Sequence, residues 1–286
     1  MGTQLGVGIE DPVGGVMGGT REFETLIGRT VDATRHYRGF DDPINGEAVT
    51  ASIAGGRSPL IAWHAFNKLN NGTDARWKFI AAGLYDAVIL QRADELRSLG
   101  NVPIRFVFHH EPENDIDSIG DQGKCGASPA EFAPAWVHVK RTMRSAGVGT
   151  NVKFGVCLMG TTYRKGLAPL WIPSTMKPDF IASDGYNHGT ATSAGWRSFT
   201  DIFSGALSFA ASRGKLLTIE ECGTVEGQTD QKAAWFAEAS AAIKSWAVPM
   251  FMYSQVTADK PFGMMDYHVD TSASALTSFK GLMGAL

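Results

Sequence analysis

The chain has 286 residues, of which 44% are hydrophobic and 19% charged, and its formal net charge is -3 with a pI of about 6.2. This balance is typical of a globular protein with a large core and excludes the strongly basic character of nucleic-acid and anionic-membrane binders. No apolar run approaches the ~20 residues of a transmembrane helix. The first residues, MGTQLGVGIEDP, lack the basic and apolar regions of a signal peptide, so we expect that none is used or that one has been removed. Three scattered cysteines allow at most one disulfide and form no C-x-x-C zinc motif.

Apolar segments with strand character alternate along the chain with segments of helical periodicity. In chain order, we expect strands at 4–10, 34–40, 58–66, 103–110, 152–160, 179–187, 216–223 and 248–256. Helical patterns lie at 21–33, 46–54, 75–100, 128–147, 200–214, 229–247 and 271–286. Apolar strands separated by helices predict a parallel sheet covered by helices. Eight such units in a chain of this length predict a (β/α)8 TIM barrel, forming a single domain over residues 1–286.

In such a barrel the carboxyl ends of the strands form one face, and that face carries the active site. Glu111 follows the fourth predicted strand, and Glu221 lies at the end of the seventh. Retaining hydrolysis of a glycosidic bond needs one carboxylic acid to protonate the leaving oxygen and one carboxylate, about 5 to 5.5 Å away, to attack the anomeric carbon. The acid must keep its proton near neutral pH, so its pKa must be raised above that of the nucleophile. The two strand-end glutamates therefore indicate a glycosidase.

Several stretches resemble the family 26 glycoside hydrolases, a clan A family of retaining enzymes that includes β-mannanases. GLYDAVILQRADELRSLGNVPIRFVFHHEPEN is similar to the family's G-x-Y-D helix and the R-x-x-H-E strand that follows it. LWIPSTMKPDFIASDGYN resembles the element around the family's sixth strand, LLTIEECGT the E-x-G-T end of its seventh, and YHVDTSASALTSFK its closing segment. The resemblance runs in order through essentially the whole chain, and it implies an acid/base on strand four and a nucleophile on strand seven.

Carried over to this sequence, the resemblance implies that Glu111 is the acid/base and Glu221 the nucleophile. Glu221 is preferred to Glu220 because it holds the E of E-C-G. Alternation supports this choice, since neighbouring residues of a strand point to opposite faces and only one of the two can face the barrel mouth. The reaction requires no metal and no organic cofactor.

Substrate-binding candidates come partly from the resemblance and partly from position. His110 resembles the histidine beside the acid/base, and Tyr186 resembles the tyrosine that hydrogen-bonds the nucleophile. Apolar sugar faces bind aromatic rings, so tryptophans at the barrel mouth are further candidates. The other candidates lie at a strand end or in the loop beyond it: Asn187, Trp63, His64, Trp196 and Tyr253.

Two stretches of the sequence offer possible metal ligands. His109 and His110 could be ligands, but HHEPEN is not H-E-x-x-H, and successive side chains of a strand point in opposite directions. The stretch 115–123, DIDSIGDQG, resembles a calcium loop only superficially, because Ile119 stands at its fifth position and no glutamate stands at its twelfth. We therefore predict no metal site and expect an acidic loop over the barrel mouth.

The sequence departs from the family after the acid/base glutamate. Family members carry a tryptophan-bearing loop there, whereas HEPENDIDSIGDQGKCGASP has no aromatic residue before Phe132. This departure leaves the choice among mannan, glucan, xylan and bacterial envelope glycans open. We expect a retaining, endo-acting hydrolase of one such β-linked polysaccharide, monomeric unless part of a larger assembly, acting on extracellular glycan as a secreted or virion-associated protein. The alternative is a carbohydrate-binding or receptor-recognition module, such as a phage tail component, that keeps the barrel with little or no turnover.

Overall fold

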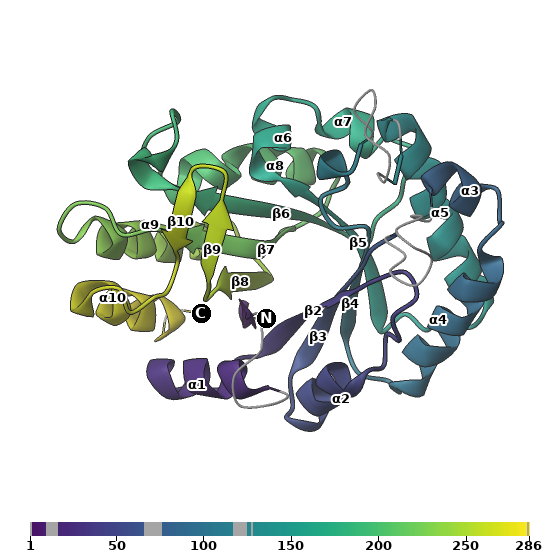
Figure 1. Ribbon diagram of the computed structural model, residues 1–286, viewed down its shortest axis with the longest axis horizontal. Helices are drawn as coiled ribbons and strands as arrows, with labels where there is room; N and C mark the ends of the chain where they lie inside the picture. Colours follow the sequence, from purple (N-terminus) through teal and green to yellow (C-terminus); the bar gives the residue numbers. More distant parts are fainter. Residues whose placement is uncertain (1, 10–16, 66–75, 117–124, 127, 285) are drawn as a thin grey trace. The chain divides into compact units, whose positions relative to one another are not determined.

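The computed structural model describes residues 2–9, 17–65, 76–116, 125–126, 128–284 and 286. The eight strands that follow the predicted order form a closed parallel barrel in which sheet order equals chain order (Figure 1). They are β1 Gln4–Gly8, β2 Ala33–Arg38, β3 Ser58–Trp63, β4 Ile104–Phe108, β5 Val152–Met159, β6 Phe180–Asn187, β7 Leu217–Thr224 and β8 Met250–Ser254. The (β/α)8 fold predicted from the sequence is thus confirmed.

Ten α-helices and two 3-10 turns connect the strands of the described chain. The helices are α1 Gly18–Ile27, α2 Glu47–Ala54, α3 Trp77–Ala81, α4 Asp86–Ser98, α5 Pro129–Ser145, α6 Gly160–Arg164, α7 Ala168–Trp171, α8 Phe199–Ser212, α9 Gln231–Ser245 and α10 Ala273–Gly284. The turns are η1 Pro112–Asn114 and η2 Gly189–Ala191. Within the described ranges, no helix combines the length and the apolar character needed to cross a bilayer.

Two features differ from the sequence prediction. The helical pattern over 75–100 is divided into α3 and α4, because Gly83 between them takes a left-handed conformation (φ +82°) that ends the first helix. An antiparallel hairpin that was not predicted, β9 Thr257–Lys260 and β10 Gly263–Asp266, follows β8.

By its contacts the chain groups into two compact units, residues 35–180 and residues 1–34 with 181–286. In the first unit, β4 pairs with both β3 and β5, and Trp63 lies beside Phe108 in the register. Parallel barrel strands are buried on both faces, and their sequences are therefore nearly continuous apolar runs. The core of this unit is aromatic: the Trp77 ring lies 5.3 Å from Phe132 and 6.2 Å from Trp171.

In the second unit, β1 pairs with β2 and β8, while β7 pairs with β6 and β8. β8 is buried along its whole length. Its Tyr253 ring packs 5.5 Å from Phe236 of α9 and 5.1 Å from Phe279 of α10, so the two helices cover this strand with a shared aromatic core.

Candidate active site

Glu111 stands just beyond β4, in a sharp turn of the backbone. β4 ends at Phe108, two residues earlier than predicted, because the chain leaves the strand conformation at His109. His109 has φ +54° and Glu111 has φ +48°, and both values lie in the left-handed region that residues with a Cβ rarely adopt. The turn leads directly into η1, where Pro112 occupies the first position.

The carboxyl group of Glu111 is partly exposed and has a hydrogen-bond donor next to it. The side-chain amide of Asn114 donates to Glu111 Oε2 over 2.8 Å. The backbone N–H of Glu111 donates to the carbonyl of Cys157 on β5 (3.2 Å), which ties the turn to the neighbouring strand. The predicted acid/base is therefore both accessible and held in place.

His110 is buried beside this turn, with 7% of its surface exposed. Its ring lies 5.7 Å from the half-exposed ring of Tyr37 and 5.8 Å from that of His64. Burial, together with the positive charge of Arg35, lowers the pKa of His110 to about 3, so the imidazole is neutral around pH 7. A neutral histidine at this place can give or accept a hydrogen bond without adding charge.

Glu113 is a second carboxyl group in the same turn, and the sequence interpretation did not include it. Its Oε1 accepts from the backbone N–H of Met159 and from the hydroxyl of Thr162, each at 2.7 Å. Burial raises the pKa of Glu113 to about 7, against these hydrogen bonds, and the charge of Glu111 adds to the rise. Glu113 fastens η1 to the end of β5.

In the other unit, β7 presents two adjacent glutamates in different environments. Glu220 is buried, with 1% of its surface exposed, whereas Glu221 is partly exposed. The pairing of β6 with β7 passes from Ser183–Ile219 to Asp184–Glu221, so the register skips Glu220 at a bulge. As alternation predicts, only Glu221 of the two is accessible.

A tyrosine of β6 binds the accessible glutamate. The hydroxyl of Tyr186 donates to Glu221 Oε2 over 2.7 Å and forms a second hydrogen bond, 2.8 Å long, with Ser254 Oγ at the end of β8. A Cβ at Gly223 would stand 2.8 Å from the Tyr186 ring. Because glycine has no Cβ, the glycine of E-C-G leaves room for that ring to pack against β7. Ser254 directly follows Tyr253, which the sequence analysis names as the substrate-binding candidate of this strand end.

Tyr186 belongs to a cluster of rings. Its ring stacks with His188 (5.9 Å, 9° between planes) and lies 4.9 Å from Tyr267, and His188 Nδ1 is 2.7 Å from the Tyr267 hydroxyl. Burial lowers the pKa of His188, with Lys260 contributing, and burial raises the pKa of Tyr267. Both groups are therefore neutral near pH 7, and Glu221 is the acidic member of this group.

Two aromatic residues predicted to contact substrate lie in the core instead. Trp63 is fully buried, stacks on Phe40 with ring centres 4.8 Å apart, and donates its indole N–H to the Phe40 carbonyl. Tyr253 is also fully buried, and its hydroxyl donates to the carbonyl of Tyr267 (2.7 Å). Both predictions are corrected, because burial inside the barrel wall leaves neither ring a face for a sugar.

Asn187 is buried too, with 1% exposed, and its amide organises the backbone. Asn187 Nδ2 donates to Thr224 Oγ1, and its Oδ1 accepts from the backbone N–H groups of Gly189 and Arg197. This use of the amide corrects its assignment as a substrate-binding residue. His64 and Trp196 are partly exposed, as a substrate-binding role requires.

The cysteine next to Glu221 is not a competing nucleophile. Cys222 is fully buried, and burial together with Asp184 raises the pKa of its thiol. A reactive thiol needs a lowered pKa and exposure. The acidic loop compared with a calcium site lies, for residues 117–124, outside the described residues.

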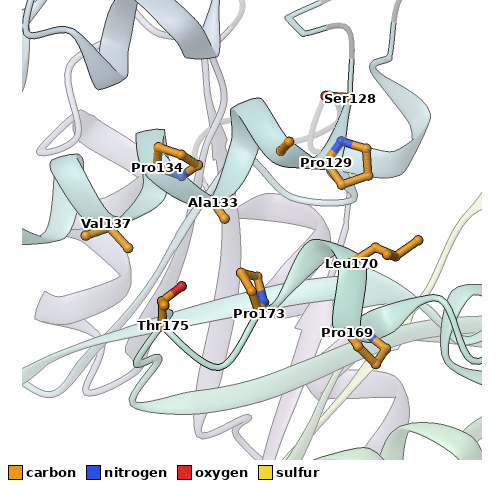
Figure 2. A pocket seen from close by; sticks show the side chains of 10 residues that line it. Ser128, Pro129, Ala133, Pro134, Val137, Pro169, Leu170, Pro173 and Thr175 are labelled. Carbon is orange, nitrogen blue, oxygen red and sulfur yellow. The ribbon is translucent and has the colours of Figure 1, made fainter.

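Two hollows can be described within single units. One, of about 730 Å³, lies between α5 and the α7 region, where Pro134 and Val137 face Pro173 and Leu170 (Figure 2). Its lining has no titratable side chain and no aromatic ring, so it is not suited to glycosidic chemistry. The other, of about 480 Å³, has a mixed polar and apolar lining. Its residues follow β6 and β7, belong to β10 or precede α10: His188, Thr190, Ala191, Val225, Glu226, Met264, Met265, Asp266 and Thr271.

The chain is similar to several named proteins in sequence or in structure. It is 26% identical over 275 residues to Endoglucanase H of Acetivibrio thermocellus, a match that covers 93% of this chain and 29% of the relative. Among solved structures, the catalytic domain of a family 26 endo-β-1,4-mannanase of Bacillus sp. JAMB-750 superposes with a TM-score of 0.67 at 14% identity, covering 99% of this chain and 86% of the other. The chain has the fold of the family 26 glycoside hydrolases.

A structure described as fungal β-1,4-galactanases is similar to the same degree, with a TM-score of 0.66 at 13% identity over 98% of this chain and all of the other. No protein-family model matches the sequence. Because relatives named for different polysaccharides share this fold, the fold by itself does not name a substrate.

Proposed function

We propose that the chain is a retaining, endo-acting glycoside hydrolase with Glu111 as acid/base and Glu221 as nucleophile. The observation that carries the proposal is the state of Glu221: an accessible carboxylate at the end of β7, bound by the Tyr186 hydroxyl at 2.7 Å, beside a second glutamate that is buried. Glu111 supplies an accessible carboxyl group at the end of β4. In a parallel barrel, strand ends four and seven belong to the same face.

In the first step, a Glu221 oxygen attacks the anomeric carbon while the bond to the leaving oxygen breaks and Glu111 gives that oxygen its proton. In the second step, Glu111 takes a proton from water, whose oxygen displaces Glu221 from the anomeric carbon. The two displacements each invert the anomeric centre, and the product therefore retains the configuration of the substrate. The Tyr186 hydroxyl holds Glu221 in one orientation during both steps.

The substrate that this site would take is a β-linked polysaccharide. The named relatives are an endoglucanase, an endo-β-1,4-mannanase and β-1,4-galactanases, and the chain spans less than a third of the endoglucanase. The polar hollow beside His188 offers carboxylate, hydroxyl and imidazole groups for sugar hydroxyls. We propose that residues 1–286 act as one catalytic domain and need no cofactor.

The experiment is to measure reducing-end release from mannan, mixed-linkage glucan, xylan and a bacterial envelope glycan. Wild-type protein is compared with Glu111→Gln and Glu221→Gln, each checked for folding by circular dichroism. We expect one glycan to be cut and both variants to lose at least 1,000-fold in rate, in line with the contribution of acid–base and nucleophilic groups. Binding to a glycan without turnover by the wild type would favour the recognition module instead.

A further inference from the structure

The turn that carries Glu111 is built around one buried histidine, His109. His109 is fully buried, and its backbone N–H donates to the Trp63 carbonyl (2.8 Å). Two N–H groups approach its Nδ1, from the backbone of Ala65 at 3.2 Å and from the indole of Trp77 at 3.3 Å. On its other side, Nε2 lies 2.8 Å from Asp115 Oδ2. Both ring nitrogens thus have defined partners.

These partners fix the tautomer of His109. Because two donors point at Nδ1, that nitrogen is an acceptor, and the proton must reside on Nε2, which donates to Asp115. His64, His109 and Asp115 lie close enough together to hold an ion. However, the lone pair of Nδ1 is turned to N–H donors and Nε2 carries a proton, so His109 is not a metal ligand in this arrangement. Within this cluster His109 and Asp115 share a hydrogen bond, and the His64 ring lies 5.4 Å from the His109 ring.

The hydrogen bond between His109 and Asp115 closes a short loop around Glu111. His109 and Glu111 both have left-handed backbones, which persist only where the surroundings determine them strongly. The Asn114 backbone N–H donates to the Glu111 carbonyl (3.0 Å), and that of Asp115 donates to the Pro112 carbonyl (3.1 Å). Asp115 therefore connects η1, and with it the backbone of Glu111, to a histidine that is itself anchored to Trp77.

We propose that His109 and Asp115 are a positioning pair that sets the direction of the Glu111 carboxyl group for proton transfer to the leaving oxygen. The inference rests on the proposed function, because it assumes that Glu111 is the acid/base. Neither residue is catalytic in this account, since each acts through Glu111. A displacement of about 1 Å can cost a reacting group a factor of about 100 in rate.

The test uses a readout that a merely structural role would not move: the dependence of kcat/KM on the leaving group. The substrates are the phenyl and 2,4-dinitrophenyl β-glycosides of the disaccharide unit of the glycan that the panel identifies. Phenolate leaves only with a proton from the acid, whereas dinitrophenolate leaves without one, and kcat/KM reports the step in which the aglycone departs. A badly placed acid therefore slows the phenyl glycoside selectively.

Asp115→Ala removes the acceptor, whereas Asp115→Asn keeps an oxygen that can accept from His109 Nε2. We expect Asp115→Ala to lower kcat/KM for the phenyl glycoside at least tenfold while the value for the dinitrophenyl glycoside changes less than threefold, and Asp115→Asn to recover most of the loss. Asp86→Ala is the matched control, because it removes the carboxylate partner of another histidine, His138, at 2.6 Å. It should leave the ratio of the two rates unchanged.

A folded Asp115→Ala protein with the wild-type ratio would overturn the inference. If that variant does not fold, Asp115→Ser shortens the side chain and the same ratio decides. Glu111→Ala serves as the benchmark, and it separates the two proposals. If the wild type cuts no glycan of the panel, or if Glu111→Ala shows no leaving-group dependence, the proposed function fails and the inference fails with it. If Glu111→Ala shows the dependence and the Asp115 variants do not, only the positioning pair is wrong.

Discussion

The hydroxyl of Tyr186 lies 2.7 Å from Glu221 Oε2 and donates a hydrogen bond to it. The same hydroxyl meets Ser254 Oγ at 2.8 Å, so the Tyr186 hydroxyl of β6 joins Glu221 of β7 to Ser254 of β8. Hydrogen bonds to charged groups contribute about 1.5 to 3 kcal/mol. In the proposed mechanism this contact orients the nucleophile and supports its ionised form.

Replacing Tyr186 with Phe should therefore lower kcat/KM by roughly 10- to 100-fold, the equivalent of one hydrogen bond to a charged group. The measurement is the steady-state rate on the glycan identified by the panel. Tyr253→Phe is the control, because it also removes one phenol hydroxyl, but one that donates to a backbone carbonyl in the core. It should lower thermal stability and leave kcat/KM within about threefold. Equal losses in the two variants would contradict the assignment of Tyr186.

Asn114 should influence the protonation of the proposed acid. Its amide donates to Glu111 Oε2 over 2.8 Å, and a hydrogen bond to a carboxylate favours the charged form. Asn114→Ala removes that donor, so we expect the basic limb of the pH profile of kcat/KM to move to higher pH. The limb should not move in Asn45→Ala, which removes an exposed amide bonded to Ser98. A shift to lower pH in Asn114→Ala would contradict the proposed contact.

Glu113 should make stability depend on pH. Burial raises its pKa from 4.5 to about 7, so the folded protein holds a proton that the unfolded chain releases at lower pH. The stability that this group contributes is present below pH 4.5 and is lost as the pH rises to about 7, by at most about 3 kcal/mol. Chemical denaturation at pH 4.5, 6 and 8 should show that Glu113→Gln removes this part of the pH dependence.

The control for Glu113 is Glu22→Gln, on the exposed side of α1. It should follow the wild-type pH dependence of unfolding. If Glu113→Gln also follows the wild type, Glu113 is ionised in the folded protein at neutral pH and its burial has no such effect.

Two tryptophans should respond differently to substitution. Trp63 is fully buried, so Trp63→Ala should cost about 3 to 5 kcal/mol of unfolding free energy. Trp196 is partly exposed and lies beside Gly227, where a Cβ would stand 2.5 Å from its ring. If Trp196 stacks on a sugar, Trp196→Ala should raise KM by roughly three- to tenfold with a smaller effect on stability. An unchanged KM in Trp196→Ala would remove this residue from the binding site.

The strands and their order could be predicted, because a parallel barrel buries each strand on both faces and so leaves an apolar run in the sequence. The difference in exposure between Glu220 and Glu221 could also be predicted, since the pleat sends neighbours to opposite sides. At the end of β8, alternation predicts that Tyr253 and Ser254 point to opposite sides of the strand. It does not say which of the two packs against the surrounding helices. The sequence interpretation chose Tyr253, and the structure shows that Ser254 meets Tyr186.

The turn after β4 could not be predicted from local pattern. His109 and His110 extend an apolar strand, but the chain turns at His109 because its ring is bound by Ala65, Trp77 and Asp115, which are distant in sequence or lie beyond the strand. The burial of Trp63 has the same origin, since Phe40 covers its ring from another segment. Such contacts depend on tertiary packing and have no signature in a window of a few residues.

The stereochemistry of the products formed with azide distinguishes the nucleophile from the acid/base. Glu221→Ala and Glu111→Ala are incubated with sodium azide and the 2,4-dinitrophenyl β-glycosides of cellobiose, mannobiose and xylobiose, and the products are assigned by NMR. With Glu221 as nucleophile and Glu111 as acid/base, azide takes the place of the missing Glu221 carboxylate and gives the α-glycosyl azide, whereas Glu111→Ala still forms the glycosyl-enzyme and gives the β-glycosyl azide. The opposite assignment of products, or full activity of Glu221→Ala without azide, would contradict the account.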